Sequence, residues 1–135
     1  MATLPLLSDA DLTPEARAVF DDIRATRGSD FINNFWRALA HDPALLAATW
    51  DRLKVVMGPG TLDPLVKEML YIAVSVTNGC SYCVHSHTAA ARAKGMTDAQ
   101  HTEMLAVIAM AAQTNALATA TQVPVDAAFD AGAPT

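Results

Sequence analysis

The chain has 135 residues, of which 52% are hydrophobic and 17% are charged, and its formal net charge is −5 at pH 7. This length suits one domain with a real core and argues against two independent domains. A negative net charge without a basic cluster argues against nucleic acid and anionic membranes as partners. The charged share lies below the usual value of about 25%, so we expect part of the apolar surface to be buried between subunits of an oligomer.

The N-terminal sequence lacks the cationic segment of a signal peptide. Along the whole chain, the longest apolar stretches are interrupted well short of the roughly 18 residues that a membrane span needs. We therefore expect a cytoplasmic protein without membrane contact. In that compartment a cysteine pair is more often catalytic or metal-binding than a structural disulfide.

Helix signals recur along the whole chain. A capping side chain before proline is typical of helix starts, and Thr97 with Gln100 fits a capping box. Glycines mark several of the ends, among them a Gly-Pro-Gly turn. The six expected helices begin near Thr13, Phe31, Ala44, Asp63, Cys80 and Thr97.

No segment shows the alternating period that a strand requires, so we predict an all-α fold, a compact bundle of about six helices. Residues 1–12 are expected to form an N-terminal arm that lies on a neighbouring subunit. Residues 13–123 are expected to form a single helical domain, and residues 124–135 a C-terminal tail.

Each helix should bury one apolar side. The positions expected on these sides include Phe31, Phe35 and Leu39 in the second helix, Leu45, Leu46, Trp50, Leu53 and Val56 in the third, and Leu65, Met69, Ile72, Ala73 and Val76 in the fourth. The fourth helix also carries a polar stripe, formed by Lys67, Glu68, Tyr71, Ser75 and Asn78.

Both cysteines of the chain lie just after an Asn-Gly pair, where a new helix begins. A helix N-terminus favours a thiolate, and the spacing of Cys80 and Cys83 lets one sulfur attack a substrate while the other closes a disulfide. His87 falls on the same helix face as both sulfurs, whereas His85 points elsewhere. The short turn also makes the fourth helix a neighbour, so Glu68 can orient and stabilise the imidazolium of His87 in a proton relay.

Two other readings of this stretch remain open. The cysteines can be inert core residues, because free cysteine is among the most buried residue types. They can also bind zinc together with His87 and a fourth ligand, either Glu68 or His85. The zinc reading is weaker because no second Cys or His pair completes the usual set of ligands.

The pattern of these residues resembles a known family. The spacing resembles that of the carboxymuconolactone decarboxylase and alkylhydroperoxidase D-like superfamily. The pattern consists of Glu68, eleven intervening residues, Cys80-X-X-Cys83, three more residues and His87. The resemblance extends from about Phe31 to the region of Leu117. It implies an all-helical subunit that assembles into homotrimers or homohexamers, with the redox pair near a subunit interface.

The resemblance implies a thiol-dependent alkylhydroperoxidase or disulfide reductase, an oxidoreductase of antioxidant defence. In this reading Cys83 meets the peroxide, Cys80 is its more exposed partner, and Glu68 with His87 forms the proton relay. The substrate would be a small hydroperoxide or disulfide, the reductant an unidentified dithiol, and neither a cofactor nor a metal is expected. The alkylhydroperoxidase D proteins proper have a histidine just before the second cysteine, where this chain has Tyr82. Lactone decarboxylases of aromatic catabolism generally lack the cysteine pair, so that activity is the less favoured alternative.

From the residues alone the order of the two sulfurs stays open. In thioredoxin-like proteins the first cysteine of the motif attacks, whereas the resemblance assigns the peroxide to the second.

Overall fold

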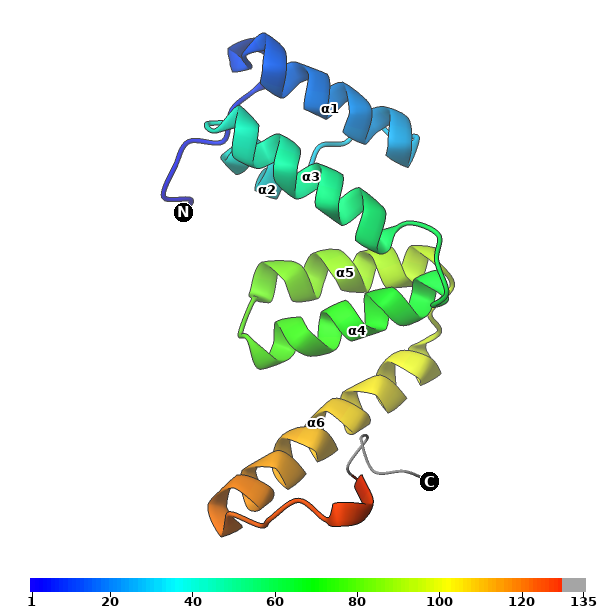
Figure 1. Cartoon of the computed structure of the whole chain (residues 1–135). Coiled ribbons are helices and arrows are strands. Elements are labelled where there is room, and N and C mark those ends of the chain that lie inside the picture. The colour runs from blue at the N-terminus through cyan, green and yellow to red at the C-terminus, as the bar shows by residue number, and fades with distance from the viewer. Residues whose placement is uncertain (130–135) are drawn as a thin grey trace. The chain divides into compact units, whose positions relative to one another are not determined.

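The computed structural model describes residues 1–129, and over this range the protein consists of helices and connecting segments without strands (Figure 1). The all-α prediction is confirmed. The elements are η1 Asp9–Asp11, α1 Pro14–Arg27, α2 Asn34–Leu39, α3 Pro43–Met57, α4 Pro64–Thr77, α5 Ser81–Ala93, α6 Asp98–Thr121 and η2 Ala127–Phe129.

The chain folds into two compact units, Met1–Leu62 and Asp63–Thr135. The first holds α1 to α3 and the second holds α4 to α6. A single domain over residues 13–123 stays a prediction, because it depends on how these two units associate.

The predicted helix starts are confirmed at four places, because their signals are local. The side chains of Thr13, Asp42, Asp63 and Thr97 each accept a hydrogen bond from a backbone N–H in the first turn of their helix. Proline occupies the first position of α1, α3 and α4, where a missing N–H costs no helical hydrogen bond.

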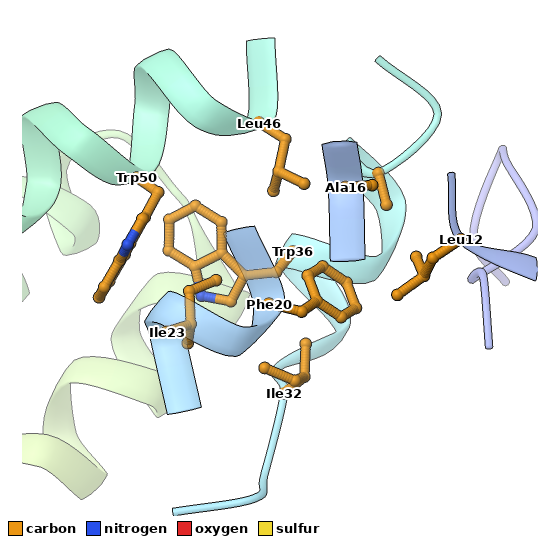
Figure 2. Packing of buried hydrophobic residues seen from close by; sticks show 9 residues of the cluster. Leu12, Ala16, Phe20, Ile23, Ile32, Trp36, Leu46 and Trp50 are labelled. Atoms are coloured by element: carbon orange, nitrogen blue, oxygen red, sulfur yellow. The ribbon is translucent and has the colours of Figure 1, made fainter. Parts of the chain in front are cut away.

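The core of the first unit is a cluster of apolar side chains from α1, α2, α3 and the segments beside them (Figure 2). Trp36 of α2 meets Trp50 of α3 edge to face, with ring centroids 5.6 Å apart at 84°. Phe20, Ile23 and Leu46 are fully buried, and each such side chain contributes roughly 1.5–3 kcal/mol. The cluster therefore fixes the three helices against one another.

The segment before α1 packs on the first unit itself. Leu12 is buried in the core cluster, and the carboxylate of Asp9 bonds to the guanidinium groups of Arg24 and Arg37. Residues 9–12 are thus held by their own unit, which the expectation of an arm on a neighbouring subunit did not foresee.

The buried sides of α2 and α3 differ from the predicted ones. Phe31, Phe35, Leu45 and Val56 are 68%, 41%, 50% and 44% exposed, so the prediction that they are buried is wrong. The physical reason is register. Helix α2 begins three residues later than expected, so Phe31 lies outside it, and Trp36 is the buried residue of this helix. In α3 the buried side holds Leu46 and Trp50, and neither Leu45 nor Val56 shares it.

In the second unit α4 and α5 run antiparallel and side by side, joined by the Asn-Gly turn (Figure 1). Gly79 sits in this turn with φ +68°, a conformation that favours glycine. The small core here contains Ile72, Ala91, Met96 and Met104.

Helix α4 buries part of its polar stripe together with its apolar residues. Glu68 and Ser75 are both 4% exposed and lie on the buried side with Ile72. Val76, expected to be buried, is 39% exposed. The sequence suggested that the polar and apolar residues of α4 lie on opposite sides of the helix. In the structure residues of both kinds share the buried side.

Helix α6 is long and apolar enough to meet the length and composition criteria for a membrane-crossing helix, contrary to the sequence expectation. A single helix of this kind is weak support for a membrane span, although only 6% of the window that meets the criteria is buried, unlike the core helices of water-soluble proteins that meet the same criteria.

Candidate active site

Two free thiols lie at the start of α5. Cys80 is the N-cap residue of this helix, and its Sγ accepts a hydrogen bond of 3.4 Å from the backbone N–H of Cys83. Both cysteines are half-buried. The expected position at a helix N-terminus is therefore confirmed, and the hydrogen bond from the Cys83 backbone to the Cys80 sulfur joins the two residues.

The two thiols differ in acidity. Hydrogen bonds from the side chain and the backbone of Cys83 lower the pKa of Cys80. Burial, with the adjacent Cys80, raises the pKa of Cys83 to about 11. Cys80 is therefore the more readily ionised thiol of the pair. At neutral pH Cys83 keeps its proton unless a base removes it.

The carboxylate of Glu68 is buried between two donors from α5. Its Oε2 lies 2.7 Å from Nδ1 of His87, and its Oε1 lies 2.7 Å from Nζ of Lys94. An ionised carboxylate only accepts hydrogen bonds, so Nδ1 of His87 is the donor. When the imidazole is neutral, its Nε2 then carries the lone pair and can accept a proton.

Burial alone would raise the pKa of Glu68. The hydrogen bonds from His87 and Lys94, with the positive charges of these groups, outweigh burial and lower it below its usual range. The buried carboxylate is thus an anion at neutral pH.

Tyr71 of α4 stacks on the ring of His87, with centroids 3.6 Å apart and planes 19° from parallel. Together with the bond to Glu68, this contact fixes both the position and the plane of the imidazole.

Sequence reasoning predicted the association of Glu68 with His87 but missed the two neighbours that hold this pair. Lys94 lies seven residues after His87, on the same helix face, and Tyr71 lies three residues after Glu68, one turn along α4. These spacings were the available signal. Recognising it required knowing how α4 and α5 pack.

The zinc set suggested by the sequence is not assembled. His85 is exposed, and its Nδ1 lies 2.8 Å from the backbone oxygen of Ser81, away from Glu68. Among residues 1–129 no three His, Cys, Asp or Glu side chains are grouped as metal ligands.

The all-helical fold carries two thiols at a helix start and a buried carboxylate–imidazole pair, the features on which the resemblance to the alkylhydroperoxidase D-like superfamily rests. Residues 43–126 match the model of the carboxymuconolactone decarboxylase family. The chain belongs to this family, which confirms the resemblance drawn from Glu68, the cysteine pair and His87.

Solved and curated relatives agree with this membership. A crystal structure of the alkylhydroperoxidase AhpD core from Rhodospirillum rubrum is 69% identical to the chain, with a TM-score of 0.93 over 96% of this chain and 97% of that one. An uncharacterised protein in the cox locus of Paracoccus denitrificans is 34% identical over 65% of this chain and 77% of its own length.

Two relatives carry the name alkyl hydroperoxide reductase AhpD. The protein from Maricaulis maris is 37% identical over 50% of this chain, and the one from Mycobacteroides abscessus is 41% identical over 45%. The matched regions cover 36% and 34% of those two proteins, so the similarity spans about a third of their length.

Proposed function

We propose that the protein is a thiol-dependent peroxidase of the alkylhydroperoxidase type, which also reduces small disulfides. The observation that carries the proposal is a pair of adjacent thiols at the start of α5, one turn from a histidine bonded to a buried carboxylate. The names of the AhpD relatives support the same reaction class. A cytoplasmic location and a trimeric or hexameric assembly belong to this proposal.

The first step oxidises Cys83. Because its pKa is raised to about 11, Cys83 has little thiolate at neutral pH and needs a base. His87 lies four residues further along the helix, on the same face, and its Nε2 takes the proton while Glu68 stabilises the imidazolium. The Cys83 thiolate then attacks the O–O bond of the hydroperoxide. It becomes a sulfenic acid, and the other oxygen leaves as an alcohol after taking a proton from His87.

The second step uses the acidity of Cys80. Its lowered pKa makes Cys80 the more acidic thiol of the pair, and once ionised its thiolate attacks the sulfenic sulfur of Cys83. The S–S bond forms as the S–O bond breaks, and the hydroxyl group leaves as water after taking up a proton from solvent, which balances the one that Cys80 lost on ionising. An external dithiol then reduces the disulfide, so one hydroperoxide consumes one dithiol in each cycle.

The test counts thiols before and after one equivalent of an organic hydroperoxide. We expect the wild type to lose two thiols without forming intermolecular crosslinks. Cys83→Ser should not react with the hydroperoxide, whereas Cys80→Ser should trap a single sulfenic acid and stop there.

Each unexpected outcome overturns a different part of the proposal. A wild type that stays reduced under excess hydroperoxide would exclude the peroxidase reaction. A sulfenic acid that forms in Cys83→Ser but not in Cys80→Ser would reverse the roles of the two sulfurs.

A further inference from the structure

Glu68 is a buried anion that needs a partner whose charge does not change. The residue is 4% exposed, and a buried charge is stable only when it is paired and hydrogen-bonded. His87 supplies a full positive charge only while it is protonated, and in the proposed reaction it gains and loses a proton in every cycle. During the neutral half of that cycle, His87 alone would leave the carboxylate without a cation.

Lys94 supplies the constant charge. Its Nζ lies 2.7 Å from Oε1, the carboxylate oxygen that His87 does not use, so the two donors occupy separate oxygens of Glu68. Tyr71 is a further titratable side chain of this group, and because burial raises its pKa, it contributes no charge at neutral pH. Lys94 is the C-cap residue of α5, and Gly95, with φ +94°, follows it where the helix ends.

We infer that Lys94 is a positioning residue of the relay, which keeps Glu68 ionised in both protonation states of His87 and thereby fixes Nδ1 as the protonated nitrogen. The inference concerns the relay of the proposed peroxidase reaction and rests on that proposal. Its consequence is that the proton taken from Cys83 stays on His87 for return to the leaving alcohol, because Glu68 cannot accept it. A purely structural role for Lys94, as a cation near the C-terminus of α5, would leave the state of Glu68 unchanged.

The test uses three substitutions that remove one property at a time. Lys94→Arg keeps the charge and the donors, Lys94→Gln keeps a donor without charge, and Lys94→Met keeps only the apolar stem. Arg92→Met is the matched control, because Arg92 is a nearby cation that pairs with the exposed Asp98 instead of Glu68. The readouts are the titration of the Glu68 carboxyl by carbon NMR, the His87 tautomer by nitrogen NMR, and the rate of thiol loss with an organic hydroperoxide.

We expect Glu68 to titrate at higher pH in Lys94→Met and Lys94→Gln, and the Nδ1-protonated tautomer of His87 to lose its dominance. Thiol loss at pH 7 should slow by roughly tenfold or more in Lys94→Met and by much less in Lys94→Arg. Arg92→Met should match the wild type in all three readouts.

The inference is overturned if Glu68 and His87 give wild-type spectra in Lys94→Met, or if Arg92→Met changes them equally. If Lys94→Met does not fold, the milder Lys94→Gln decides in the same way. A wild type whose thiols ignore hydroperoxide would end the proposed function, while the two NMR readouts would still judge the role of Lys94.

Discussion

The imidazole of His87 lies between two groups of α4, a carboxylate at one ring nitrogen and an aromatic ring against its face. Glu68 fixes the first contact at 2.7 Å, and Tyr71 fixes the second at 3.6 Å between ring centroids. A proton relay works only when donor and acceptor are held in line, so we attribute the orientation of the ring to both residues.

A double-mutant cycle measures the contribution of the stacked ring. We expect the effects of Tyr71→Leu and His87→Ala on the free energy of unfolding to be coupled by about 0.5–1.5 kcal/mol. Stacked aromatic rings stabilise a protein by about that amount beyond the stabilisation from their buried area. Urea denaturation of the four proteins gives the value. Tyr71→Phe, which keeps the ring, is the control and should retain the coupling. Strictly additive effects of the Leu and Ala substitutions would show that the stack does not stabilise the site.

The lowered pKa of Glu68 predicts how stability depends on acid. In the unfolded chain this carboxyl binds protons at a higher pH than in the folded protein, so the stabilisation from its charge is present above about pH 4.5 and is lost as pH falls through the folded pKa. Urea denaturation between pH 3 and 7 should therefore show a steep loss of stability for the wild type and a shallower one for Glu68→Gln. Glu103→Gln, which removes an exposed carboxylate of α6, is the matched control and should follow the wild type.

At the scale of the helix, the end of α5 depends on one glycine. Gly95 has φ +94°, and a Cβ built there would meet no atom within 4 Å. Replacement by alanine should therefore strain the backbone without a steric clash, lowering the free energy of unfolding by about 1–2 kcal/mol. Thermal unfolding followed by circular dichroism measures the loss. Asparagine, which tolerates positive φ better, should cost less than alanine, and equal losses would contradict this account.

Four helix starts could be predicted from the sequence because a local cap marks them, whereas the start of α2 and the buried faces of several helices could not. A cap such as Asp42 with Pro43 acts within one turn, so its effect does not depend on the rest of the fold. Which side of a helix is buried depends on its packing partners. Phe31 and Phe35 follow an apolar spacing but are exposed, because the helix starts at Asn34 and buries Trp36 instead.

For the candidate site, the positions within one helix could be predicted from the sequence, whereas the contacts between helices could be predicted only in part. The spacing of Cys80, Cys83 and His87 within one helix predicted their common face, since helical geometry is fixed. The contact of Lys94 with Glu68 joins two helices, and its register is decided by packing between α4 and α5. No single-helix pattern specifies that register.

At the scale of the whole molecule, many large apolar side chains are exposed on the surface of the single chain. Helices α4 and α6 carry Val66, Leu70, Val74, Leu105, Val107, Met110 and Leu117, which are 42–63% exposed. Covering several hundred Å² of such surface is worth several kcal/mol at about 25 cal/mol per Å². The exposure agrees with the low charge content and supports the predicted oligomer.

Light scattering without detergent tests this prediction. We expect a particle of three or six times the 14.3 kDa chain mass. Val107→Glu should weaken the assembly, because it puts a charge on an apolar position that is 63% exposed in the single chain. Gln113→Glu adds the same charge to a polar position of α6 and is the control. A wild type that remains a 14.3 kDa particle, or that sediments with lipid vesicles, would contradict the prediction.

Cys80 does for α5 what threonine and aspartate do for α1, α3, α4 and α6: its side chain caps the first turn. In the reduced protein the free sulfur of Cys80 accepts the capping hydrogen bond, and a disulfide sulfur would be a weaker acceptor, so we expect the cap to favour the reduced form over the oxidised form. A stabilised reduced form raises the reduction potential of a dithiol, by about 30 mV for each 1.4 kcal/mol. Equilibration with glutathione measures the potential, and we expect the cap to shift it upward. The residue that starts the helix would thus also decide which cellular dithiols can supply the protein with electrons.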